Sequence, residues 1–104
     1  MSPEDKKRIV QIVGQALIAD GVLADAERAH LEGVMEGLGM SDAERKDAFR
    51  GISVDSPVEQ RVAELSAEGR ARLRTEIDAV ASASGDSGRA EREIVAHLRG
   101  LLAS

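Results

Sequence analysis

The sequence of 104 residues contains no cysteine, no tryptophan and no tyrosine, and it has a single phenylalanine. The absence of cysteine excludes disulfide bonds, thiolate metal sites and cysteine nucleophiles. The shortage of aromatic residues excludes a core of large rings, so leucine, isoleucine and valine must supply most of the buried apolar area. A chain of this length is expected to form one domain, over residues 1–104, with a small core.

The sequence also lacks an excess of positive charge and a long apolar run. Its 19 acidic residues outnumber its 14 basic residues, which gives a net charge of −5. Proteins that bind nucleic-acid backbones carry clustered positive charge, so no nucleic acid is expected as a partner. No run approaches the roughly 20 apolar residues of a membrane-spanning helix, and residues 1–8 lack the apolar segment of a signal peptide. We therefore expect a cytoplasmic protein.

Apolar residues recur at steps of three and four, which predicts amphipathic helices along the whole chain. Serines at 2, 41 and 56 stand at expected helix starts, and Ser41 with Glu44 has the pattern of a capping box. Gly21 and Gly39 are expected to end helices. Short connections favour antiparallel neighbours, so we predict an all-α fold, a compact bundle of about six helices. The expected helices cover residues 3–19, 25–38, 42–50, 57–65, 67–83 and 89–102.

Two acidic stretches repeat along the chain. Residues 19–27 match residues 83–91 at an offset of 64, so that Glu27 corresponds to Glu91. The apolar positions agree at the same offset, because Ile9 falls on Leu73 and Val13 falls on Ile77. The repeat predicts two pseudo-repeated helix-loop-helix units, whose acidic bends lie near each other on a common surface.

A family resemblance is carried by two stretches. Residues 16–31 read Ala-Leu-Ile-Ala-Asp-Gly-Val-Leu-Ala-Asp-Ala-Glu-Arg-Ala-His-Leu, and residues 39–44 read Gly-Met-Ser-Asp-Ala-Glu. They resemble the tellurite-resistance TerB-like family, whose pattern is Ala-Asp-Gly, a hydrophobic residue two positions on, and a glutamate six residues after the glycine. Asp20, Gly21 and Glu27 match this pattern. In the second copy Gly85 and Glu91 match, but Ser84 replaces the expected aspartate.

The resemblance implies a small all-helical domain with a non-enzymatic accessory or scaffold role in stress response or tellurite-type resistance. It also implies that acidic residues bind a metal ion and that the protein works with a protein partner, including peripheral association with a membrane complex. No catalytic triad pattern of serine, histidine and aspartate is found, so enzymatic activity is not expected.

The first acidic bend also matches the second half of an EF-hand calcium loop. With Gly21 at the sixth position, Asp20 is fifth and Glu27 is twelfth, but Ala16 and Ile18 stand where two ligands are required. Any Ca²⁺ site is therefore expected to be weak, at about 10⁻⁴ to 10⁻³ M. The predicted ligands of a weakly bound divalent cation such as Ca²⁺ are Asp20, Asp25, Glu27, Asp86 and Glu91.

Three other interpretations are open. The acidic bend can be purely structural, because Asp20 can accept hydrogen bonds from turn amides and Glu27 can act as a capping carboxylate. The chain can be a protein-interaction module without metal, including a homodimer. It can also be an enzyme with paired carboxylates, which requires a raised pKa on one of them. His30 and His97 are interpreted as surface or rim residues, since their spacing does not suit a metal.

Overall fold

The computed structural model describes residues 2–18, 25–52, 58–83 and 89–103, without the side chains of 81–83 and 89–91. Over these ranges the chain is helical and has no β-strand, which confirms the all-α prediction. No helix in these ranges is both long and apolar enough to span a bilayer. The helices are α1 (Pro3–Leu17), α2 (Asp25–Gly37), α3 (Asp42–Arg50), α4 (Val58–Ala63), α5 (Ala67–Ala83) and α6 (Arg89–Leu102).

Several helix ends lie where the sequence predicts them. The Ser2 hydroxyl accepts a hydrogen bond from an amide in the first turn of α1. Ser41 and Glu44 form the reciprocal capping box at the start of α3. The predicted break near Ser66 separates α4 from α5. Helices α1 and α4 each end two residues earlier than predicted, and the predicted roles of Gly21 and Ser56 fall outside the described residues.

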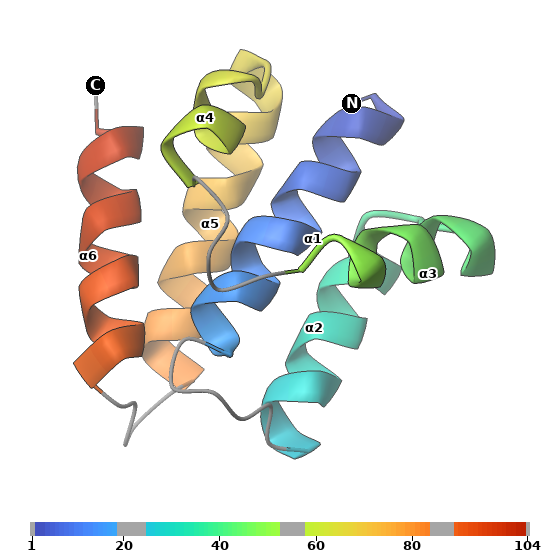
Figure 1. Ribbon diagram of the computed structural model, residues 1–104, viewed down its shortest axis with the longest axis horizontal. Helices are drawn as coiled ribbons and strands as arrows, with labels where there is room; N and C mark the ends of the chain where they lie inside the picture. The colour runs from blue at the N-terminus through green and yellow to red at the C-terminus, as the bar shows by residue number, and fades with distance from the viewer. Residues whose placement is uncertain (1, 19–24, 53–57, 84–88, 104) are drawn as a thin grey trace.

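Helix α1 lies in the middle of the bundle and contacts the other five helices of the described chain (Figure 1). All nine successive residues from 9 to 17 are buried. The sequence predicted an amphipathic helix here, with one apolar face. The buried surface of α1 is wider than one face. Two glutamines are buried as well, with Gln11 7% and Gln15 3% exposed. A helix that is enclosed on all sides is normally hydrophobic around its whole circumference. In α1 two glutamines are enclosed together with the apolar residues.

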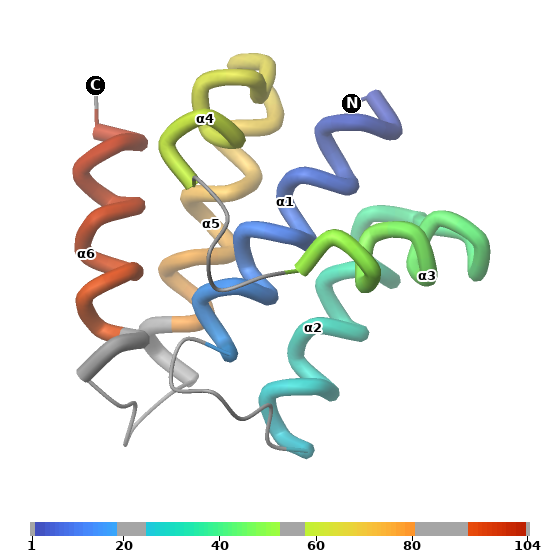
Figure 2. The backbone as a smooth tube through the Cα atoms, viewed as in Figure 1, coloured from blue at the N-terminus to red at the C-terminus, as the bar shows by residue number. Residues whose placement is uncertain are grey.

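The end of α3 approaches α1 closely. A Cβ atom at Gly14 would lie 2.5 Å from Cδ1 of Ile52. A Cβ atom at Gly51 would collide with the amide of Gln11. Glycine at 14 and 51 therefore allows α3 to lie across the bundle, at a steep angle to α1 and α2 (Figure 2).

The first and last helix pairs run in matching directions. Helices α1 and α5 run toward one end of the molecule, and α2 and α6 return from that end (Figure 1). The paired helices pack on each other, and α1 packs on α5. This arrangement agrees with the predicted helix-loop-helix units. The two units differ in burial, because α1 is enclosed whereas α5 exposes polar residues such as Arg74 and Asp78.

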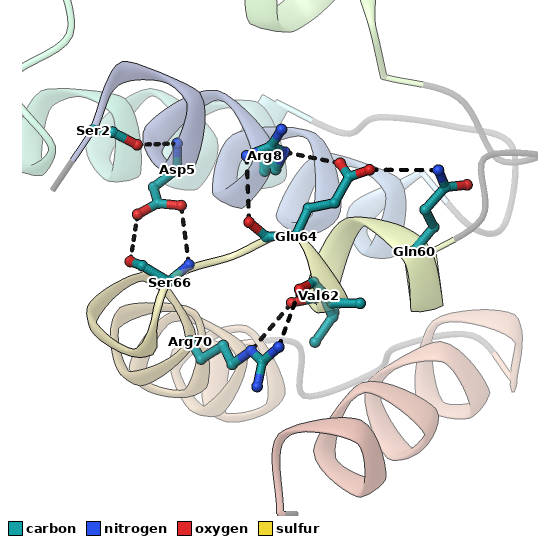
Figure 3. Close-up of polar contacts among 9 residues, drawn as sticks. Ser2, Asp5, Arg8, Gln60, Val62, Glu64, Ser66 and Arg70 are labelled. Carbon is teal, nitrogen blue, oxygen red and sulfur yellow. Dashed lines mark hydrogen bonds and ion pairs between the residues drawn. The ribbon is translucent and has the colours of Figure 1, made fainter.

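A buried carboxylate joins the start of α1 to the start of α5 (Figure 3). Asp5 is 4% exposed, and it accepts hydrogen bonds from the hydroxyl and the amide of Ser66, at 2.5 and 3.2 Å. The Ser66 hydroxyl in turn accepts a bond from the amide of Gly69 (3.1 Å). The hydrogen bond from the Ser66 hydroxyl lowers the pKa of Asp5 below its ordinary value of 3.8. The first turn of α1 is thereby fixed to a helix end 61 residues away.

This contact predicts a pH-dependent stability difference. Asp5→Asn should lower the free energy of unfolding by about 1 to 3 kcal/mol at neutral pH, because buried donors on Ser66 lose a charged acceptor. Since folding lowers the pKa of Asp5, its contribution is fully present above pH 3.8 and declines as the pH falls through the folded value. Urea unfolding at neutral pH and at several acidic pH values measures the difference between wild type and variant.

The exposed neighbour Glu4 provides the control, and Glu4→Gln should change stability little at any pH. The account of the Asp5 contact is wrong if the gap between wild type and Asp5→Asn stays constant from neutral pH to well below 3.8.

Candidate functional site

The predicted cation ligands are only partly within the described chain. Asp25 and Glu27 lie in the first turn of α2, where Asp25 is exposed and Glu27 is half-buried. Asp20 and Asp86 are outside the described residues, and Glu91 is described by its backbone alone, in the first turn of α6. Among the side chains that are described, no three carboxylates or histidines gather closely enough to hold a metal ion. The five-ligand site remains a prediction.

Both acidic segments that are described begin a helix. Carboxylates in a first helical turn interact favourably with the positive end of the helix dipole, and Asp25 and Glu27 occupy that position in α2. The starts of α2 and α6 lie at the same end of the bundle (Figure 1). This placement suits both the structural interpretation of the acidic bend and a cation site shared between the two bends.

The two histidines have different surroundings. His97 on α6 lies 2.7 Å from Oε1 of Glu59 on α4, and both side chains are about half exposed. The pKa of Glu59 is lowered by its own backbone amide and then by His97. His30 on α2 is half-buried, and its buried Nε2 makes no hydrogen bond to a described residue. Within the described chain, neither histidine belongs to a group of three or more potential metal ligands.

A groove lies between α2 and α3 in the described surface, and we call it the α2–α3 groove. It has a volume of about 430 Å³. Phe49 and Met35 are its apolar residues; Met35 is 1% exposed and closes the floor, while Phe49 is partly buried against the core. The groove is lined by Glu32 and Met35 from α2 and by Asp42, Arg45, Lys46, Phe49 and Arg50 from α3.

A tight corner joins the two helices that form the groove. Gly39 has a positive φ of 69°, a conformation that glycine adopts freely. Its amide bonds to the carbonyl of Glu36 (3.0 Å), and the amide of Met40 bonds to the carbonyl of Met35 (3.2 Å). This pair of bonds is a Schellman motif. The capping box at Ser41 starts α3 immediately afterwards, so local sequence signals fix the geometry of the groove.

The groove has a polar rim with charges of both signs. Arg45 donates a hydrogen bond from Nε to the carbonyl of Met40 (3.1 Å), and Glu32 lies 4.0 Å from Arg28. Lys46 and Arg50 are exposed, one turn apart on α3, and neither forms an ion pair with a described residue. The groove thus has apolar residues at its base and, on its rim, two cations that form no ion pair with a described residue.

Sequence reasoning did not find this groove. Met35 lies in the core and Phe49 packs against it, as apolar residues of amphipathic helices do. The signal that could have found the groove is the sequence from 46 to 50, in which Lys46 and Arg50 share a helix face with Phe49. Two cations beside the only aromatic residue of the chain indicate a solvent-exposed helix face rather than a buried one.

Comparison with family models, curated proteins and solved structures finds no match to this chain. What the structure shows is a small, compact, all-helical domain, with a Cα radius of gyration of 12.3 Å. The resemblance to the TerB-like family therefore remains a prediction from the residues at 16–31 and 39–44.

Proposed function

We propose that this chain is a non-enzymatic TerB-like accessory or scaffold protein, acting in stress response or tellurite-type resistance, that binds a protein partner in the α2–α3 groove. The groove is the observation that supports binding. Its volume of about 430 Å³ is within the range of roughly 300 to 1,000 Å³ that is typical of binding sites. Aromatic and arginine side chains such as Phe49 and Arg50 are enriched at protein interfaces.

Binding of a divalent cation such as Ca²⁺ at the acidic bends is a second part of the proposal. The common location of the starts of α2 and α6 supports it, because Asp25, Glu27 and Glu91 all belong to these first turns. A protein-interaction module without metal, including a homodimer, is the alternative, and the groove supports it equally.

A titration with Ca²⁺, followed by amide chemical shifts, separates these possibilities. Since the site has few ligands, we expect shifts confined to residues 19–27 and 84–91, with a Kd of about 10⁻⁴ to 10⁻³ M. Glu27→Gln should abolish the shifts. Glu36→Gln, an exposed change on the same helix, should leave them unchanged. If the spectrum does not respond to millimolar Ca²⁺, the cation part of the proposal is wrong and the metal-free module is favoured.

Use of the groove is tested with a site-specific label. The chain has no cysteine, so Glu32→Cys provides one fluorophore site on the groove and Ala96→Cys provides a matched exposed site on α6. Peptides selected from a random library on the immobilised chain should change the emission at 32 and leave the emission at 96 unchanged. Phe49→Leu, which keeps an apolar side chain but removes the ring, should weaken the binding severalfold.

Two results would count against the groove. One is a selection whose peptides act at 96 as strongly as at 32. The other is unchanged affinity in Phe49→Leu, once thermal melting has shown that the variant is folded.

A further inference from the structure

The charges around the α2–α3 groove bear on which partner it can accept. We propose that the groove binds a peptide segment of another protein in which an apolar side chain is flanked by carboxylates. This inference rests on the proposed use of the groove for protein binding. The apolar side chain would contact the partly buried ring of Phe49, and the carboxylates would meet Lys46 and Arg50.

Lys46 and Arg50 lack the hydrogen-bond and ion-pair partners that most arginines of the described chain have. Most arginines in the described chain contact a carboxylate or a backbone carbonyl, as Arg72 does with Glu76 at 2.7 Å and Arg61 does with the carbonyl of Gly51 at 2.9 Å. Arg50 and Lys46 do neither within the described chain, although Arg50 is near enough to Asp47 to contribute to its lowered pKa. Asp47 is already paired with Lys7 at 2.8 Å.

The spacing of these two cations places them on the same face of α3. Lys46 and Arg50 are four residues apart, so their charges are neighbours on one face of α3. Like charges at this spacing disfavour the helix. A partner that brings carboxylates to this face relieves the repulsion, and an arginine can bind a carboxylate through two parallel hydrogen bonds.

The charge of the groove is opposite in sign to that of the whole molecule. The chain carries a net charge of −5, yet the groove is lined by three basic residues against two acidic ones. Both acidic residues have a local role: Glu32 faces Arg28, and Asp42 lies in the first turn of α3, where the helix dipole favours a carboxylate. The unpaired positive charge therefore lies on the second half of α3, at Lys46 and Arg50. The carboxylates of a partner would lie against this half of the helix.

The apolar floor completes the site. Phe49 offers a rigid ring that is only partly buried, whereas Met35, at 1% exposed, closes the floor. An amphipathic segment that places apolar residues on one face and carboxylates on the other satisfies both features, as in groove recognition of helical peptides.

Parallel peptide selections test this inference. Random-sequence peptides are selected on the native chain and on Lys46→Glu/Arg50→Glu, and the recovered sequences are compared. Glutamate and aspartate next to apolar residues should be enriched on the native chain and lost on the double variant. For peptides from the native selection, Arg50→Glu should weaken binding about three- to tenfold, because rim charges contribute modestly. Arg92→Glu, an exposed arginine on α6, should have no effect.

The possible failures are distinguishable. Peptides that act on the label at 32 without acidic enrichment would overturn this inference and leave the proposed groove intact. Peptides that bind the chain without changing the emission of the label at 32 would contradict both this inference and the proposed use of the groove. Self-association of the chain that is abolished by Arg50→Glu, seen by sedimentation, would show that the occupant is a second copy and overturn the inference. Binding of the chain to anionic lipid vesicles that is lost in the same variant would overturn it in favour of a membrane surface.

Discussion

Helix α1 is held by contacts on its whole circumference, and the positions of the other helices follow from this. Residues 9–17 are buried without interruption, so five helices must cover them. Gly14 and Gly51 permit the close approach of α3, and the Asp5–Ser66 contact fixes the opposite end of α1 to α5. The burial of so many apolar side chains on one helix supplies a large share of the hydrophobic stabilisation of a small domain.

The α2–α3 groove is a consequence of this arrangement. Both helices pack on α1, and the tight corner at Gly39 forces α3 across the direction of α2. The gap between them is closed below by the buried Met35 and bordered by the partly buried Phe49, beneath a charged rim. Stability and the proposed binding role therefore use different faces of α3: one face contacts α1, and the other carries Lys46 and Arg50.

The sequence predicted local features well and long-range features poorly. Apolar spacing, the capping box at Ser41 and the glycine at 39 specify helices and their ends, because these signals act within a few residues. The enclosure of α1 could not be predicted in the same way, since Gln11 has the polarity of a surface residue. The contact between Asp5 and Ser66 could not be predicted either, because the two residues are 61 positions apart in the sequence. The cation site depends largely on side chains outside the described residues.

Amide hydrogen exchange tests the central position of α1 most directly. If α1 is enclosed on all sides, its amides at residues 9–17 can exchange only when the whole domain unfolds. Their protection should then equal the free energy of unfolding measured with urea, and it should be at least as high as that of any other helix. Faster exchange in α1 than in α5 or α6 would contradict the account, because it would place the last structure to open elsewhere in the molecule.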